Sequence, residues 1–503
     1  MKILKAIGGA FGFVWKNTRV WLITSVCLLV FFLTVSLIIT QVTFINNTFN
    51  TIFGEERRVL VSGDPSEAQR YAFSEGIENK EDALAAANAL NETICEEGFV
   101  LLKNDNVLPL TEENPKVSVF GMNSVDLVYG GSGSSARSSD TAVDLYQSLT
   151  NAGISYNETL KKIYDDAQAA GGGRGSSPSM GDIPSGFATG ELPLSAYGGE
   201  ISGLVGEYDD AALFVVSRIG GEGYDLPRTM KNEDGSAVTG ANAEDHYLEL
   251  DNYEKALLSA VCGAFENVIV IVNSSASMEL GFLEDDTYGG KIKAALWVGS
   301  PGGTGMNALG NILTGKVNPS GRLVDTYVRD FTATPSYANF STNFSELGDT
   351  YLLNGAKQEA HFVEYEEGIY VGYRYYETRG FTDGEQWYDE NVVYPFGYGL
   401  SYADFTWSVG SVRIGDDKET ATELTENAVL SSADKNKTIF VDVTVKNNDS
   451  SIMAGKDVVQ LYFTAPYIDG EVEKSHVVLG DFAKTDLLQP GDEDTVTLEL
   501  RLS

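Results

Sequence analysis

Cysteine is scarce in this sequence of 503 residues, which contains only Cys27, Cys95 and Cys262. Cys27 lies in a long apolar run. The other two occur in helical patterns, where a small buried hydrophobic side chain is the simplest interpretation. So few cysteines exclude a disulfide-rich scaffold. One disulfide between Cys95 and Cys262 remains open as an alternative.

Histidine is equally scarce, and its positions argue against a metal centre. His246, His361 and His476 lie far apart, and none has a second ligand at the short spacing typical of metal sites. The sequence therefore predicts no metal, and it predicts no other cofactor either.

Positive charge is also in short supply. The sequence has 35 Lys and Arg against 72 Asp and Glu, and its formal net charge at pH 7 is −37. Residues 1–54 are the exception, because they contain basic residues and no acidic one. So acidic a body repels phosphate backbones, which excludes nucleic acid as a partner.

One long hydrophobic run is present near the N-terminus. Residues 20–40 contain 21 residues without a charge, and at about 1.5 Å per helical residue they would span roughly 30 Å, the thickness of a bilayer core. Basic residues precede the run, with Trp15 and Trp21 near its start. The positive-inside rule predicts a cytoplasmic segment 1–19, a transmembrane helix over 20–43 and an extracytoplasmic body at the cell membrane. A cleaved signal peptide is the alternative.

Residues 44–75 are polar and predict a spacer, after which helical and strand patterns alternate. An amphipathic helix is expected over 80–98. Strand patterns bounded by glycine then alternate with helical ones. This alternation predicts an α/β domain over 76–404, with a mostly parallel sheet and helices on both faces. The strands are expected at 116–121, 211–219, 267–275 and 293–300, and the helices at 140–153, 252–265 and 303–315.

The pattern changes again at about Phe405. From there to residue 503, β-branched and aromatic runs are separated by short turn signals, with no helical stretch. This predicts an all-β sandwich over 405–503 that is cut off at its end.

Several stretches together resemble one enzyme family. Residues 96–110, 217–225, 315–327, 365–378 and 394–405 resemble the α/β-sandwich domain of glycoside hydrolase family 3, the β-glucosidases and their relatives. The tail resembles the fibronectin type III-like domain that accompanies it. The resemblance covers residues from about 76 to 503, in order.

The resemblance implies a retaining glycoside hydrolase that acts on β-linked glucosides or related glycosides. It assigns the general acid/base to Glu222 and places the nucleophile, an aspartate, on a (β/α)₈ barrel domain. No nucleophile signature occurs in this chain, so the barrel is expected downstream, in a permuted order, or in trans. The alternative is a non-catalytic, membrane-anchored module that binds carbohydrate or a partner.

The chemistry explains the glycine-rich setting of Glu222. Retaining hydrolysis needs two carboxyl groups about 5 Å apart, one as nucleophile and one as proton donor. An acid supplied by a neighbouring domain must project across an interface, and Gly220, Gly221 and Gly223 permit that reach. A solvated glutamate in a polar turn is the alternative.

Other residues carry weaker expectations. The resemblance suggests that Ser134, in the glycine-rich stretch 129–135, touches the sugar. A plain turn is equally compatible, whereas a nucleotide loop is disfavoured because G-K-[ST] is lacking. Asp225 and Arg228 are expected to brace the Glu222 loop or to form a surface pair. The aromatic cluster 370–376 suggests stacking on sugars, but packing at a domain junction is favoured.

Overall fold

The computed structural model describes most of the chain, and the chain forms two compact units, Met1–Ala83 and Leu84–Ser503. The described residues are 18, 21–23, 25–36, 77, 79–131, 133–137, 139–174, 187–222, 226–232, 234–340, 350–353, 356–359 and 365–502.

In the first unit, residues 21–23 and 25–36 are helical. None of the helices in the described part of the chain has both the length and the apolar character that crossing a bilayer requires. The predicted transmembrane helix over 20–43 is therefore not supported by the structure, although part of that range lies outside the described residues. The predicted spacer 44–75 lies wholly outside them.

The α/β domain of the second unit is built on a six-stranded sheet with the order β1-β6-β5-β4-β2-β3. Strands β3, β2, β4, β5 and β6 are parallel; of these, β2, β4, β5 and β6 were predicted and the two-residue strand β3 was not. The edge strand β1 was not predicted, and it pairs antiparallel with β6. The strands are β1 (Val100–Asn104), β2 (Lys116–Phe120), β3 (Ser155–Tyr156), β4 (Ala211–Arg218), β5 (Val268–Ser274) and β6 (Ile292–Trp297).

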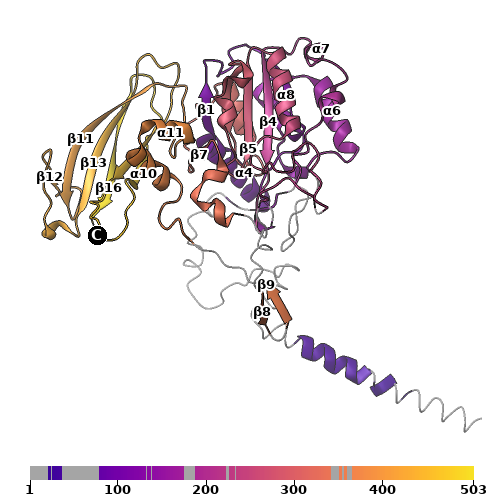
Figure 1. The fold of residues 1–503 in the computed structure, drawn as a ribbon, viewed down its shortest axis with the longest axis horizontal. Coiled ribbons are helices and arrows are strands. Elements are labelled where there is room, and N and C mark those ends of the chain that lie inside the picture. Colours follow the sequence, from indigo (N-terminus) through magenta and orange to yellow (C-terminus); the bar gives the residue numbers. More distant parts are fainter. Residues whose placement is uncertain are drawn as a thin grey trace, which may run out of the picture. The chain divides into compact units, whose positions relative to one another are not determined.

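Helices cover both faces of this sheet, as predicted. Along β4, Phe214 and Val216 pack in one core with α6 (Glu158–Ala169) and α8 (Asn252–Ala264). Leu213 and Val215 pack in a second core with α5 (Leu145–Ala152) and α9 (Asn307–Leu313). Every residue of β4 is buried, because successive side chains of a strand point to opposite faces. Figure 1 shows α8 beside β4.

Local signals in the sequence fix where these helices begin. Asp144 caps α5 by accepting a hydrogen bond from the Gln147 amide, and Gly153 ends that helix in the left-handed region. A full capping box between Asp251 and Glu254 starts α8. The helix α4 (Lys80–Gly98) leads directly into β1.

The segment that follows the sheet contains short elements. The strands β7 (Tyr327–Val328) and β10 (Val392–Tyr394) pair with each other, and β8 (Thr350–Leu353) pairs with β9 (Ala356–Glu359). In the sequence, two helices lie between β9 and β10: α10 (Tyr373–Asp383) and α11 (Glu385–Asn391).

An all-β region begins with β11 at Phe405. One sheet has the order β12-β11-β13-β16 and a second pairs β14 with β15. A small core that includes Val445, Val459 and Leu498 lies between them. The strands are β11 (Phe405–Gly415), β12 (Thr422–Glu423), β13 (Thr438–Asn447), β14 (Val458–Phe463), β15 (Val478–Lys484) and β16 (Glu493–Arg501).

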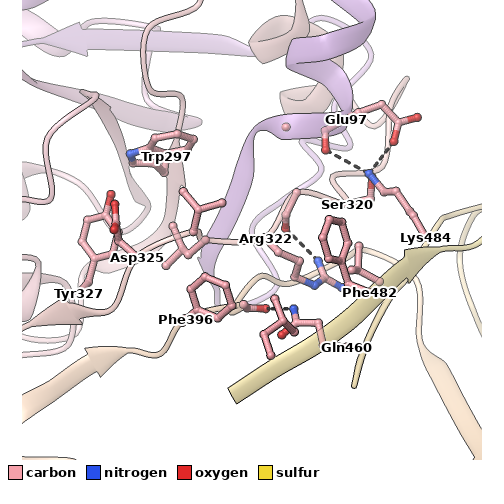
Figure 2. A pocket seen from close by; sticks show the side chains of 17 residues that line it. Glu97, Trp297, Ser320, Arg322, Asp325, Tyr327, Phe396, Gln460, Phe482 and Lys484 are labelled. Atoms are coloured by element: carbon pink, nitrogen blue, oxygen red, sulfur yellow. Dashed lines mark hydrogen bonds and ion pairs between the residues drawn. The ribbon is translucent and has the colours of Figure 1, made fainter. Parts of the chain in front are cut away.

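Ion pairs join the α/β domain to the all-β region. The carboxylate of Glu97 accepts hydrogen bonds from Lys456 and Lys484, and Arg322 pairs with Asp457. A cavity of about 400 Å³ lies beside these contacts. Figure 2 shows the side chains that line it, Phe482 among them. Charged groups with several partners fix the two regions against each other more firmly than isolated surface pairs would.

Candidate active site

Two loops meet at the carboxyl edge of the parallel sheet. The strands β2 and β4 are parallel neighbours, with Phe120 opposite Phe214. The loop after β2 reaches Ser134, and the loop after β4 reaches Glu222 only four residues beyond the last strand residue, Arg218. The carboxyl ends of parallel strands are where ligands bind in such sheets.

The structure brings together Glu222 and Ser134, both of which were singled out from the sequence. The amide of Ser134 donates a hydrogen bond to Oε2 of Glu222 over 2.8 Å. Both residues are exposed. The two loops also touch at Gly131, where an added Cβ would lie 2.9 Å from the carbonyl oxygen of Gly220.

Gly133 is required by this contact. Its φ is +64°, which favours glycine, and an added Cβ would lie only 2.5 Å from Oε2 of Glu222. A side chain at position 133 would therefore push the carboxylate away from the Ser134 amide.

The hydrogen bonds from Ser134 also set the charge of the carboxylate. They lower the pKa of Glu222 below its ordinary value, through the backbone amide first and the Ser134 hydroxyl second. A hydrogen bond donated to a carboxylate stabilises its ionised form. In this arrangement Glu222 is held in its ionised form and has no proton to deliver.

The base of the Glu222 loop is held by a buried ion pair that the sequence analysis missed. Arg218 and Glu254 are both almost fully buried, and the guanidinium makes two hydrogen bonds to the carboxylate, of 2.8 and 2.7 Å. Arg218 also donates to the carbonyl oxygens of Tyr247 and Glu249. Paired in this way, the buried charge avoids the large cost of isolation.

Tyr247 fixes the next residue of the loop. Its buried hydroxyl accepts a hydrogen bond from the Ile219 amide over 3.0 Å, and its ring lies under the Arg218 guanidinium at 5.4 Å. The backbone at 218 and 219 is therefore fixed, while Glu222 lies exposed three residues later. The capping-box pattern at 251–254 is the one sequence signal that could have pointed to Glu254.

Two further carboxyl groups lie buried near this pair. Burial raises the pKa of Glu191 to about 8, although its oxygens accept hydrogen bonds from the Met122 and Leu192 amides. Burial also raises the pKa of Asp251 to about 6. Protonation spares both groups part of the cost of a buried charge.

Arg228 contacts residues 337–340. Its guanidinium donates to the carbonyl oxygens of Tyr337, Ala338 and Phe340, and it stacks over the Tyr337 ring at 4.8 Å. Arg228 thus fastens the loop to residues 337–340. Asp225 lies outside the described residues, so its pairing stays a prediction.

The alternative of a disulfide between Cys95 and Cys262 is wrong. Cys95 and Cys262 are free thiols, and they belong to the two cores on opposite faces of the sheet. They are the small buried hydrophobes that the helical patterns indicated.

Of the histidines, His246 bonds to Glu279 over 3.0 Å, and His361 lies outside the described residues. Among the residues that the structure describes, no group of three potential ligands could hold a metal ion.

Comparisons with known proteins identify the family. The sequence model of the glycosyl hydrolase family 3 C-terminal domain matches residues 99–373, which is more than half of the chain. The chain therefore belongs to glycosyl hydrolase family 3.

Curated relatives agree with this assignment. Beta-glucosidase A of Butyrivibrio fibrisolvens is 34% identical over 440 residues, which cover 84% of this chain and 47% of that protein. Beta-glucosidase of Ruminococcus albus is 30% identical over 410 residues, which cover 80% of this chain and 35% of that protein. The chain thus spans half or less of the length of these relatives.

Solved structures of β-glucosidases have a fold similar to that of this chain. The β-glucosidase of Paenibacillus barengoltzii has a TM-score of 0.61 at 29% identity, over 82% of this chain and 38% of that chain. The β-glucosidase 3B of Thermotoga neapolitana in complex with glucose has a TM-score of 0.61 at 28% identity, over 84% of this chain and 49% of that chain.

Proposed function

We propose that this chain is the acid/base half of a retaining β-glucosidase-like enzyme, with Glu222 as the general acid/base. The observation that carries the proposal is the exposed carboxylate at the carboxyl edge of the sheet, at the end of a loop whose base is fixed at Arg218 and Ile219. The substrate is a β-linked glucoside or a related β-glycoside, as the names of the relatives suggest.

The proposal needs a second carboxylate from elsewhere. In the first step the aspartate of a (β/α)₈ barrel domain attacks the anomeric carbon, and Glu222 gives its proton to the departing oxygen. In the second step Glu222 takes a proton from water, which displaces the aspartate from the sugar. The barrel is supplied downstream or in trans.

The hydrogen bond from Ser134 has a role in this cycle. While it is made, Glu222 is held as the ionised base. Release of the amide, as the barrel docks, would raise the pKa of Glu222 and allow it to act as an acid. Ser134 then becomes available to contact the sugar.

The experiment is a comparison of leaving groups with a protein that carries this chain and its barrel. Glu222→Gln is expected to lower kcat/KM on alkyl β-glucosides by about 10² to 10⁴. Attack on 2,4-dinitrophenyl β-glucoside, whose leaving group needs no proton, should be largely retained, and azide should restore turnover.

Glu200→Gln, at an exposed glutamate distant in sequence, is the matched control. Unchanged activity of Glu222→Gln on alkyl glucosides contradicts the proposal. Sugar binding without any turnover in the wild type favours the non-catalytic module.

We also propose that residues 20–43 anchor the protein in the cell membrane with the body outside. The uncharged run 20–40 and the basic residues before it support this proposal. The test is carbonate extraction of cell membranes, in which the full chain is expected to stay in the pellet and a version lacking residues 1–43 to be released. Release of both versions contradicts it.

A further inference from the structure

A groove lies between α10 and a loop of the all-β region, away from the Glu222 loop. Its volume is about 590 Å³, within the range of roughly 300–1,000 Å³ of small-ligand sites. One wall comes from Tyr370 and from α10, and the other from residues 464–467 and 473–476. We call it the α10 groove.

Two exposed aromatic rings line the α10 groove. Phe381 is 69% exposed and Tyr467 is 57% exposed. Phe381 stacks on His476 with ring centroids 4.0 Å apart and an interplanar angle of 9°. One face of the Phe381 ring is thus covered by His476, and its high exposure leaves the other face open to a ligand.

A carboxylate lies among these rings. Glu473 accepts a hydrogen bond from the Tyr370 hydroxyl over 2.6 Å and a long one from the Tyr467 hydroxyl over 3.5 Å. Each carboxylate oxygen has two acceptor sites, so Glu473 can also accept hydrogen bonds from hydroxyl groups of a ligand. Thr382 and Thr464 line the same groove.

The two walls are tied together without a ligand. The amide of His476 donates to the Thr378 hydroxyl of α10 over 2.9 Å. Within the loop, Lys474 donates to the carbonyl oxygen of Pro466 over 2.7 Å. A ligand therefore finds the rings and the carboxylate already in place, which lowers the entropy cost of binding.

We propose that the α10 groove binds a neutral oligosaccharide, at a site separate from Glu222. A sugar ring combines an apolar face with a rim of hydroxyl groups. The exposed rings of Phe381 and Tyr467 can stack on the apolar face of the sugar. The Glu473 carboxylate and the threonine side chains can form hydrogen bonds with its hydroxyl groups. Neutral sugars are favoured over uronates because the chain carries a net charge of −37.

The tyrosines of the aromatic cluster 370–376 have two different roles, packing and lining the α10 groove. Tyr376 is buried. Tyr373 packs on Phe396, and its hydroxyl accepts a hydrogen bond from the Leu479 amide. These two residues have the packing role that the sequence favoured. Of the cluster's tyrosines, only Tyr370 is among the residues lining the α10 groove.

The test is direct binding to the full chain, measured by calorimetry and by saturation-transfer NMR. Cellotetraose, laminaritetraose and maltotetraose are the neutral probes, and trigalacturonate is the acidic one. At least one neutral probe is expected to bind with a millimolar dissociation constant, more tightly than trigalacturonate. Phe381→Ala and Tyr467→Ala should each weaken it by about tenfold.

Two controls separate this site from others. Phe482→Ala removes an aromatic ring of similar exposure, 64%, outside the groove, and should leave binding unchanged. Glu222→Gln should leave it unchanged as well, so a failure of the proposed acid/base role does not affect the result. Absence of binding by all neutral probes at tens of millimolar overturns the proposal. Binding that survives both groove substitutions, or that prefers the acidic probe, overturns it too.

Discussion

The backbone amide of Ser134 lies 2.8 Å from Oε2 of Glu222 and donates a hydrogen bond to it. The two residues are 88 positions apart in the sequence, and the parallel pairing of β2 with β4 brings their loops to the same edge of the sheet. The contact keeps the carboxylate ionised, because it favours the charged form.

Removal of the Ser134 side chain should raise the pKa of Glu222 towards its ordinary value. The Ser134 hydroxyl is the second cause of the lowered pKa, after the amide, so Ser134→Ala should give a partial rise and leave the amide's effect in place. The measurement is an NMR titration of the Glu222 carboxyl carbon. Ser195→Ala is the control at an exposed serine, and an equal shift in both variants would contradict the assignment.

A methyl group at position 133 should separate the two loops. The added Cβ would lie 2.5 Å from Oε2 of Glu222, and φ at Gly133 is +64°. Gly133→Ala should therefore raise the pKa of Glu222 more than Ser134→Ala does, because the hydrogen bond from the Ser134 backbone amide is lost as well. Gly153→Ala, at a glycine with positive φ but open space around it, carries similar backbone strain without the clash. Its Glu222 titration should match the wild type.

Loss of the buried arginine should strongly destabilise the α/β domain. Arg218→Met leaves Glu254 buried without its partner, which costs about 3–5 kcal/mol of unfolding free energy. Urea unfolding followed by circular dichroism measures the change. Lys162→Met, which removes the exposed pair with Asp166, should cost less than about 1 kcal/mol.

A double substitution tests the same pair from the other side. Arg218→Met combined with Glu254→Met removes both charges, so it should be less destabilising than Arg218→Met alone. Equal losses in the single and double variants would show that the pair is not the source of the effect.

Stability should fall as pH rises above 5, and Glu191 should cause part of the fall. Its pKa is about 8 in the folded chain against 4.5 ordinarily, so the folded state binds more protons than the unfolded state within that window. Stability is then lost with rising pH, by at most about 1.4 kcal/mol per pH unit for one group. Asp251 acts in the same direction up to about pH 6.

Unfolding of the wild type and of Glu191→Gln between pH 5 and 9 measures this contribution. The variant should show a shallower slope, whatever its absolute stability. Glu200→Gln, at an exposed glutamate, should keep the wild-type slope. Parallel curves for the wild type and Glu191→Gln would contradict the prediction.

The regular elements were predictable because their signals are local. Apolar runs bounded by glycine marked β2, β4, β5 and β6, and amphipathic spacing marked α4, α5, α8 and α9. The edge strand β1 was missed because it is only five residues long and follows the helical pattern 80–98 almost directly, and its pairing with β6 is a tertiary contact.

The site was predictable only in part. Glu222 and Ser134 were found through a resemblance, but the hydrogen bond between them depends on strand order, which no local pattern encodes. Arg218 read as the end of an apolar strand, and its role depends on Glu254, 36 positions away. The contacts of Arg228 with residues 337–340 are of the same long-range kind.

The fixed backbone at Ile219 sets a tether length for the carboxylate. Two residues lie between Ile219 and Glu222, so their Cα atoms are three steps apart. An extended chain advances at most about 3.3–3.6 Å per residue, so the Cα of Glu222 can sweep a radius of roughly 10 Å around the fixed Ile219. Any domain that completes the reaction must place the sugar's departing oxygen within that radius plus one side-chain length. The position of β4 thus limits where such a domain can dock, before any contact between the two surfaces is considered.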